Sequence, residues 1–327
     1  EEIRRFKEAR SFEELKVWFE GLIHEYVKWA RYLYHHGIRR QECLKELPFP
    51  YPYREGQKEL AGNVYRSIAR KRNLFIQAPT GIGKTLSCIY PSLKAMGEGK
   101  ADKLFYLTAK TITRSVAEEA FSILRREGNL YFNTVTITAK EKLCVMEKPD
   151  CNPQACPRAK GHYDRVNDAV YEIIQEVDGI TRDKVLEYAE RFKICPFEFC
   201  LDISNWVDGI ICDYNYVFDP NVKLKRYFDQ GEPGQGYLFL VDEAHNLVPR
   251  AREMYSAVLI KEDVLAAKRL VKDKSPRLTR QLERVNKICL EMKRQCEGWQ
   301  ILPDVDHLVT ALTSLFSELE KYMDEYK

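Results

Sequence analysis

The stretch Ala78–Thr85, which reads Ala-Pro-Thr-Gly-Ile-Gly-Lys-Thr, decides the fold predicted for this chain. It lies between an apolar run at 74–77, which predicts a buried parallel strand, and the run 86–93, whose apolar residues recur at helical spacing. A glycine-rich turn at a helix N-terminus offers unpaired backbone N–H groups and the positive end of the helix dipole to an anion. The stretch therefore predicts a phosphate cradle.

The residue types in this turn fit the binding of a nucleotide. Lys84 is expected to reach the β- and γ-phosphates, and the Thr85 hydroxyl is expected to hold Mg²⁺. The P-loop pattern usually opens with glycine, and here Ala78 stands at that position. The nucleotide-binding residues predicted from the pattern are Thr80, Gly81, Ile82, Gly83, Lys84 and Thr85.

A second apolar run, 237–241, ends in the sequence Asp-Glu-Ala-His at 242–245. Two adjacent carboxylates at a strand end are typical of a Walker B motif, in which Asp242 binds Mg²⁺ through water and Glu243 polarises the attacking water. A strand that merely ends in solvated acids is the alternative, and the P-loop upstream argues against it. Because Asp-Glu-Ala-His is the DEAH box, the chain resembles a superfamily 2 helicase. The predicted catalytic residues are Lys84, Asp242, Glu243 and His245.

The composition limits the class of protein. The 327 residues exceed one ordinary domain, and 45% hydrophobic with 31% charged residues describe a soluble globular chain of two or three modules. The 52 basic and 49 acidic residues leave a formal charge of +3, so any nucleic-acid track must be a local patch. No apolar run approaches the roughly 18 residues of a membrane span, and no signal peptide opens the chain, which predicts an intracellular protein without a membrane partner.

Residues 1–47 predict a helix. Ser11 and Glu14 match a capping box, and apolar residues follow at three- and four-residue spacing until Gly37, where the helix is expected to stop. An aromatic stripe of this kind more often packs against a neighbouring domain than binds a cofactor. His35 and His36 are expected to lie on the surface at the helix end.

A proline-rich break at 48–53 precedes a second helix, which is expected to start at Arg54 to Gln57 and to run to Arg72. In superfamily 2 helicases a glutamine shortly upstream of the P-loop reads the adenine edge, and Arg54 with Gln57 resembles that element. A solvated helix start is the alternative interpretation.

A strand expected at 104–108 is followed by a helix start at 109–111, and a further strand is expected at 134–138. In the helicase family, the loop after the strand at 104–108 contacts a nucleic-acid backbone. Hydroxyls and a lysine beside a helix N-terminus suit contacts to phosphates. The predicted nucleic-acid contacts are Lys110, Thr111 and Arg114.

The segment 140–206 holds five of the ten cysteines, with the spacing C-x6-C-x4-C-x38-C-x4-C. Clustered cysteines in an intracellular protein point to metal binding or catalysis rather than to disulfides. Two precede proline, as iron–sulfur ligands sometimes do, whereas structural zinc sites favour short pairs at both ends. The spacing leaves an iron–sulfur cluster, zinc and unliganded thiols open. Because the segment is highly charged, it is expected to bury little apolar surface without a metal.

A cysteine-rich insert between a P-loop and a DEAH strand resembles the XPD/DinG-type iron–sulfur DNA helicases, in the bacterial DinG-like branch. The likeness covers residues 48–255 and includes Lys-Leu-Cys at 142–144, Cys-Pro-Phe at 195–197 and the run 207–220. Carried over residue by residue, it implies a 4Fe–4S cluster on Cys144, Cys151, Cys156 and Cys195.

Two further side chains in this segment are not carried over as ligands. Cys200 is expected to be a spare thiol near the cluster, although DinG-type members place ligands close together there. His162 could be proposed as a ligand, and a solvated histidine in a polar stretch is the expectation.

The resemblance implies an α/β fold: a RecA-like P-loop lobe with a parallel sheet, an inserted and mostly helical cluster domain, and a helical arch domain. Apolar stripes over 278–292 and 308–322 predict antiparallel helices after the DEAH box. The expected division is a connector or tail of an upstream domain at 1–47, the motor lobe at 48–140 and 207–250, the cluster domain at 141–206 and an incomplete arch at 251–327.

The resemblance implies an ATP-dependent DNA helicase that translocates 5′ to 3′ on single-stranded DNA and opens forked duplex, with the cluster domain as wedge or strand guide. ATP, Mg²⁺ and a 4Fe–4S cluster are the expected cofactors, in a monomer of the prokaryotic cytoplasm and nucleoid. No pattern for a second RecA-like lobe follows residue 260, and relatives sometimes carry an upstream nuclease domain, so a piece of a longer protein is expected. The alternative is a redox-sensing DNA-binding protein that ATP switches.

Overall fold

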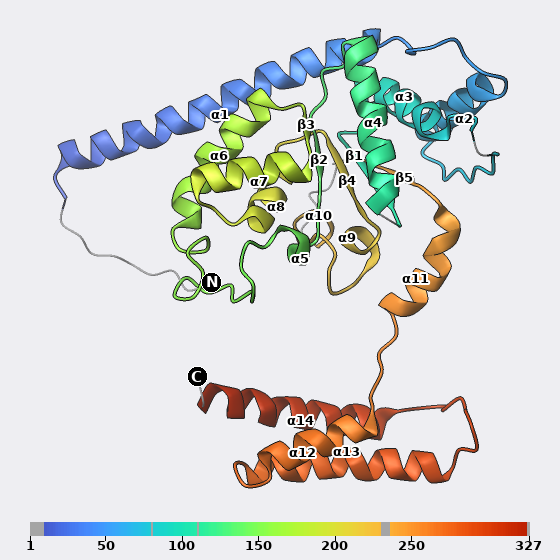
Figure 1. Cartoon of the computed structure of the whole chain (residues 1–327). Helices are drawn as coiled ribbons and strands as arrows, with labels where there is room; N and C mark the ends of the chain where they lie inside the picture. The colour runs from blue at the N-terminus through green and yellow to red at the C-terminus, as the bar shows by residue number, and fades with distance from the viewer. Residues whose placement is uncertain (1–9, 80, 110, 230–235, 326–327) are drawn as a thin grey trace. The chain divides into compact units, whose positions relative to one another are not determined.

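The computed structural model describes residues 10–79, 81–109, 111–229 and 236–325. The chain divides into two compact units, residues 1–254 and 255–327 (Figure 1). The first unit contains a β-sheet with helices on both faces, and the second is helical.

The sheet of the first unit is parallel throughout. Its strands are β1 (Lys103–Thr108), β2 (Thr134–Thr136), β3 (Gly179–Ile180), β4 (Gly209–Asp213) and β5 (Tyr237–Val241). They lie in the order β3-β2-β4-β1-β5. The strands expected from the apolar runs at 104–108, 134–138 and 237–241 are present, and the α/β class is confirmed.

Helices surround this sheet in the first unit. The longer ones are α1 (Phe12–Glu46), α2 (Gln57–Ala69), α3 (Lys84–Gly97), α4 (Thr111–Gly128), α6 (His162–Glu176), α7 (Arg182–Phe192), α8 (Pro196–Ser204) and α11 (Leu247–Met254). The short ones are α5 (Lys140–Leu143), α9 (Asn215–Phe218), α10 (Lys225–Phe228) and the 3₁₀ turn η1 (Ala244–Asn246).

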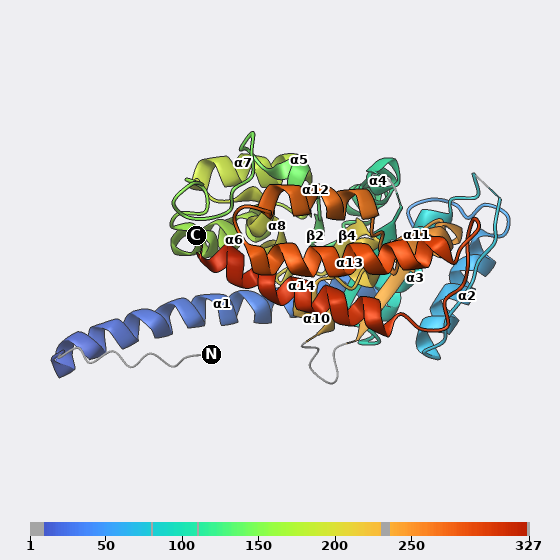
Figure 2. The ribbon, with the colours of Figure 1, turned by 90° about the horizontal axis from the view of Figure 1, so that it is seen from below.

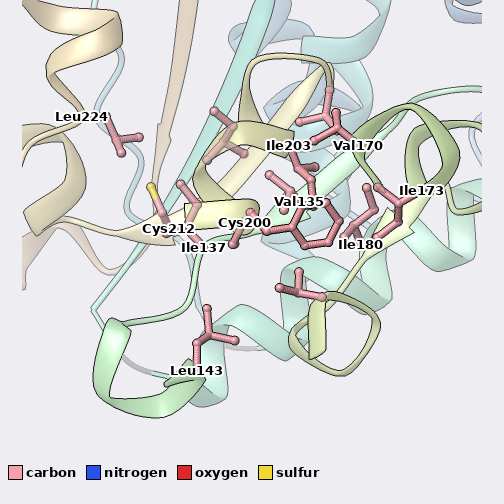
Figure 3. Close-up of a cluster of buried hydrophobic side chains, with 14 of the residues drawn as sticks. Val135, Ile137, Leu143, Val170, Ile173, Ile180, Cys200, Ile203, Cys212 and Leu224 are labelled. Atoms are coloured by element: carbon pink, nitrogen blue, oxygen red, sulfur yellow. The ribbon is translucent and has the colours of Figure 1, made fainter. Parts of the chain in front are cut away.

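Strand β1 shows why a parallel sheet reads as a continuous apolar run. Leu104 and Tyr106 pack in one core, with α3, α4 and the last turns of α1. Phe105 and Leu107 pack in the other core, with α6, α7 and α8. Figure 3 shows part of that core, including Val135 and Ile173. Because helices cover both faces, successive side chains of the strand are buried on alternate sides, and the strand is apolar along its length.

Helix α1 continues past Gly37, so the predicted stop there is wrong. The predicted capping box is present, with the Glu14 carboxylate accepting from Ser11 N at 2.8 Å. The packing role predicted for the apolar stripe at 15–33 is seen at Trp29, whose ring centroid lies 4.1 Å from that of Trp206. The other members of the stripe are exposed: Leu15, Trp18, Leu22, Tyr26 and Leu33. Leu44 and Leu47, which follow Gly37, pack in the core with α3 and α4. This packing outweighs the roughly 1 kcal/mol that glycine costs within a helix.

His36 is buried, so the surface position predicted for it is also wrong. Its Nε2 lies 3.0 Å from Asp208 Oδ2, and its Nδ1 lies 3.1 Å from Tyr131 OH. The buried Asp208 carboxylate also accepts from Arg40 Nη1 at 2.7 Å and from Asn133 N at 2.8 Å. A buried carboxylate is stable only when it is paired, and α1 supplies the cation from the same helix face that carries His36.

We expect Asp208→Asn to lower the free energy of unfolding by about 3 kcal/mol, because it leaves Arg40 without its buried partner. Urea unfolding at pH 7 measures this loss. The matched control is Glu187→Gln, whose pair with Lys184 is exposed and contributes about 0.5 kcal/mol or less.

The same pair predicts a pH dependence. Burial raises the pKa of Asp208, but its hydrogen bonds and the charges of His36 and Arg40 together hold it below its ordinary value. The stabilisation is therefore present above the pKa of the unfolded chain, about 3.9, and is lost as the pH falls through the lower pKa of the folded state. A stability loss in Asp208→Asn that is as large at pH 3 as at pH 7 would contradict this account.

The apolar run at 74–77 does not form the buried strand predicted for it. Leu74, Phe75 and Ile76 are 40%, 91% and 39% exposed, and residues 73–79 belong to no helix or strand. Within the described residues β5 is an edge of the sheet, and Phe239 on it is 39% exposed. A strand forms only where a neighbouring edge accepts its backbone hydrogen bonds, and none of the five strands pairs with this segment.

The second unit consists of α12 (Lys261–Val271), α13 (Pro276–Arg294) and α14 (Asp306–Glu325). Helices α13 and α14 lie alongside each other (Figure 2). Leu278, Leu282 and Val285 of α13 share a core with Ala311 of α14, so the two predicted stripes pack on each other. Within the described residues no helix combines the length and the apolarity needed to cross a membrane.

Candidate nucleotide and nucleic-acid site

The turn before α3 has the backbone that its glycines predict. Gly81 and Gly83 have φ angles of +86° and +78°, in the left-handed region that favours glycine. A Cβ at residue 83 would lie 2.4 Å from Gln57 Nε2. Lys84 begins α3, and its Nζ donates to Ala78 O at 2.9 Å across the turn. The turn is therefore shaped to wrap an anion at the N-terminus of α3.

Arg54 and Gln57 hold this turn from the start of α2. Arg54 Nη1 donates to Gly81 O at 2.6 Å, and Gln57 Nε2 donates to Ile82 O at 2.6 Å. Gln57 Oε1 also accepts from Arg54 N at 2.8 Å, and the Gln57 side chain is buried. The interpretation of Gln57 as a solvated helix start is therefore wrong, and its role in reading adenine stays a prediction.

Strand β5 brings Asp242 to the P-loop. Asp242 N donates to Leu107 O of β1 at 2.9 Å, which continues the ladder past the end of β5. Burial and the adjacent Glu243 carboxylate raise the pKa of Asp242, while the Lys84 charge opposes the rise. Lys84 and Asp242 thus lie within electrostatic reach of each other, as a phosphate-binding lysine and a metal-binding aspartate should.

Glu243 has φ +51° and ψ +45°, the left-handed conformation, which costs a residue with a Cβ about 1 to 2 kcal/mol. Such strain persists only where the surroundings hold it, and it clusters at functional sites. The Glu243 carboxylate lies 3.4 Å from His245 Nδ1, and both side chains are exposed. The carboxylate is therefore accessible to water.

Two side chains that sequence reasoning missed, the buried Tyr106 and the half-buried Cys88, interact with residues of the P-loop and with Asp242. Tyr106 of β1 is hydrogen-bonded to the Thr85 side chain, and burial raises the pKa of its hydroxyl. Burial also raises the pKa of Cys88 to about 11, with Asp242 adding to the rise and Lys84 opposing it. The Cys88 thiol and the Tyr106 hydroxyl are therefore neutral at physiological pH, and they add no charge beside Lys84 and Asp242.

The predicted nucleic-acid contacts are only partly visible. Lys110 and the side chain of Thr111 lie outside the described residues, as does Thr80 of the P-loop. Arg114 on α4 donates to Ile137 O at 3.4 Å, and its guanidinium lies 3.8 Å from Asp213 Oδ2. Arg114 is thus fixed against the carboxyl end of β4.

A groove of about 1000 Å³ opens beside Arg114. Its lining carries six cationic side chains and two carboxylates, Glu141 and Asp213. A local excess of cations is what a nearly neutral chain needs to hold a nucleic-acid backbone. Of these six cations the sequence predicted only Arg114 as a nucleic-acid contact, although the run Lys-Leu-Lys-Arg at 223–226 is itself a basic cluster. The cations of this basic groove are Arg114, Lys140, Lys142, Lys223, Lys225 and Arg226.

The known proteins that this chain resembles are consistent with the nucleotide site described above. The family model named DEAD_2 matches residues 113–264, from α4 through the DEAH box into α12. The chain is 22% identical over 273 residues to a regulator of telomere elongation helicase 1 homolog of Anopheles gambiae, covering 67% of this chain and 27% of that protein. It is 28% identical over 222 residues to a probable ATP-dependent helicase of Methanocaldococcus jannaschii, covering 64% and 31%.

Two solved structures share the fold. A chain described as truncated XPD matches with a TM-score of 0.50 and 18% identity, over 81% of this chain and 75% of that one. An XPD helicase matches with a TM-score of 0.50 and 20% identity, over 77% of this chain and 42% of that one. This chain therefore has the fold of these XPD chains, and over residues 113–264 it matches the DEAD_2 model. It spans 27% and 31% of the two curated relatives named above, and the DinG-like branch stays a prediction.

The four cysteines predicted as cluster ligands lie in the segment from α5 to α8. Cys144 directly follows α5 and Cys195 directly precedes α8. Lys140 is hydrogen-bonded to Cys151 and lies within electrostatic reach of Cys144 and Cys195, and Cys156 lies within reach of Cys195. Across the described ranges, no three His, Cys, Asp or Glu side chains are gathered closely enough to hold a metal ion. The set fits an iron–sulfur cluster in its donor chemistry, because four thiols are the ligands that such clusters use.

The structure places Cys200 in the core, where its Sγ lies 3.6 Å from Thr136 O and burial raises its pKa to about 12 (Figure 3). Its part as a spare thiol outside the ligand set stays a prediction. His162 is 3% exposed, and its Nδ1 accepts from Cys195 N at 3.3 Å. The solvated histidine predicted from its polar neighbours is wrong, because those neighbours face water while His162 turns inward.

Proposed function

We propose that this chain is the first motor lobe of an ATP-dependent DNA helicase, which couples ATP hydrolysis to translocation on single-stranded DNA. The observation that carries the proposal is that α3, which begins at Lys84, lies against β5, whose carboxyl end leads into Asp242, so the P-loop and the DEAH box share one end of a parallel sheet. That pairing of a phosphate cradle with a metal-binding carboxylate is the core of phosphoryl transfer from nucleoside triphosphates.

Each residue of the site has a part in the proposed reaction. The backbone of Gly81 to Gly83 and the Lys84 ammonium bind the phosphates, and the Thr85 hydroxyl and Asp242 would hold the Mg²⁺ that neutralises phosphate charge. Glu243 orients and polarises the attacking water. Arg54 and Gln57 keep the turn in shape through their bonds to its carbonyls.

The basic groove supports DNA as the partner. It lies beside Arg114, which stands at the position where the sequence predicts contacts to a strand backbone. Six cations facing two carboxylates attract phosphates without reading sequence, and this suits a motor that moves along any strand.

The remaining features of the proposal follow the likeness to XPD-like helicases. Cys144, Cys151, Cys156 and Cys195 would hold a 4Fe–4S cluster, which supplies structural cross-linking when bound. Residues 141–206 would then guide or part the strands, 251–327 would belong to an arch, and 48–140 with 207–250 would form the motor lobe. Translocation runs 5′ to 3′, by a monomer of the prokaryotic cytoplasm and nucleoid.

The strand-binding part of this function is tested at the basic groove. The double variant Lys223→Glu, Lys225→Glu should weaken binding of oligo-dT at least about tenfold, and should lower the slope of log K against log salt by about 1.4, because two phosphate contacts are lost. Fluorescence anisotropy over a salt series measures both. ATP affinity should not change, since neither lysine is near the P-loop.

The matched control reverses two lysines outside the groove, the exposed Lys16 on α1 and the half-exposed Lys184 on α7, and should leave the salt slope unchanged. Oligo-dT binding by the Lys223→Glu, Lys225→Glu variant that equals the wild type would exclude the groove as the strand site.

A further inference from the structure

Tyr214, in the turn after β4, holds the backbone of the DEAH box. The residue is fully buried. Its hydroxyl donates to Asp242 O and lies 3.1 Å from Glu243 O. A tyrosine hydroxyl has one proton, so the two carbonyls share it. This contact fixes the peptide that leads into the left-handed backbone of Glu243.

The same turn is tied to the basic groove. Asp213 lies 3.8 Å from the guanidinium of Arg114 and 3.3 Å from that of Arg250 on α11. On the other side of Tyr214, Asn215 Oδ1 accepts from Arg250 Nη2 at 3.2 Å. Arg114, Asp213 and Asn215 all line the groove, so both sequence neighbours of Tyr214 face the place where a strand would bind.

We propose that Tyr214 is a positioning residue for ATP hydrolysis, and that it transmits occupancy of the basic groove to the carboxylate of Glu243. The inference rests on the proposed function, in which Glu243 polarises the attacking water. Phosphates in the groove compete with Asp213 for Arg114, and the turn 213–215 adjusts. The Tyr214 hydroxyl passes that adjustment to the two carbonyls that it holds.

The left-handed backbone at Glu243 makes this contact effective. A residue with a Cβ leaves that conformation unless its neighbours hold it, because ordinary helical angles are lower in energy. Without the Tyr214 hydroxyl, the Glu243 carboxylate turns away from the water. Nucleotide binding does not depend on this contact, since Arg54 and Gln57 hold the P-loop independently.

Tyr214→Phe removes only the hydroxyl. In the full-length protein it should lower kcat for DNA-stimulated ATP hydrolysis by about 10- to 100-fold, while KM for ATP and Kd for oligo-dT change less than about twofold. The matched control is Tyr227→Phe, which removes another buried hydroxyl, one that donates to Ser204 Oγ at 3.1 Å, and it should keep wild-type kcat. Wild-type kcat in Tyr214→Phe, or an equal fall in Tyr227→Phe, would overturn the role.

A second measurement needs no variant. The amide of Asn246 donates to Glu243 O at 2.9 Å, so its hydrogen exchange reports on the same backbone. Saturating oligo-dT should change that exchange rate about tenfold in the wild type, and an unchanged rate would overturn the coupling. A wild type that binds ATP without cleaving it would overturn the proposed function itself. An active wild type with an equally active Tyr214→Phe would overturn the role of Tyr214 alone.

Discussion

Glu243→Gln should bind Mg²⁺-ATP as tightly as the wild type and cleave it about 10²- to 10³-fold more slowly. The amide has the shape of the carboxylate and keeps the backbone turn, but it cannot polarise the attacking water as a carboxylate does. Asp242 and the P-loop are untouched, so the ground-state complex survives. Titration with a fluorescent ATP analogue gives the affinity, and single-turnover hydrolysis gives the chemical step.

The control for this variant is Glu127→Gln on α4, an exposed glutamate paired with Arg126, which should hydrolyse ATP as the wild type does. Asp242→Asn should behave differently from Glu243→Gln and lose the Mg²⁺ dependence of nucleotide binding. Equal loss of ATP affinity in Glu243→Gln would mean that the roles of the two carboxylates are misassigned.

Replacing any one of the four proposed ligand cysteines with serine should remove the iron absorbance expected of the protein. Serine is a poor ligand for a cluster held by thiolates, and the binding free energy of the metal is also folding free energy. ATP binding at the P-loop should survive, and unwinding should fail. The cysteines concerned are Cys144, Cys151, Cys156 and Cys195.

The structure indicates which residues should become accessible to proteases when the metal is lost. The expectation that 140–206 buries little apolar surface is wrong, because Ile173, Val185 and Phe199 of α6, α7 and α8 are buried in the core beside the sheet. Residues 144–161 contain no helix or strand, so faster proteolysis should be confined to them. Limited proteolysis with mass spectrometry locates the cuts.

Cys200→Ser is the internal control for the ligand set. It should keep its iron, although a hydroxyl in that buried position costs about 1 to 3 kcal/mol of stability. Loss of iron in Cys200→Ser while Cys151→Ser retains it would show that the choice of four ligands is wrong.

Motifs whose chemistry constrains the backbone could be predicted from the sequence. Gly81 and Gly83 have the positive φ angles that a phosphate turn requires, and the apolar run at 237–241 is a strand that ends at Asp242. These features are local, since residue type and spacing decide them within about ten residues.

Features that depend on distant partners could not be predicted. His36 is buried because Asp208, 172 residues later, needs a partner. The apolar run at 74–77 pairs with none of the five described strands, and a strand exists only through such pairing with residues far away in the sequence. The role of Tyr214 could not be predicted, because nothing in the sequence separates it from the other tyrosines among the nineteen. Only the structure shows that its hydroxyl contacts the backbone of the DEAH box at Glu243 O.

The most direct test of the account is the rate of ATP hydrolysis by the full-length protein, with and without single-stranded DNA, for the wild type and for Lys84→Ala. The account predicts that oligo-dT raises wild-type kcat at least about tenfold, and that Lys84→Ala turns over at less than about a tenth of the wild-type rate with its fold intact. A wild type that binds both ATP and oligo-dT but shows no stimulated hydrolysis would be a DNA-binding protein switched by ATP, and would contradict the account.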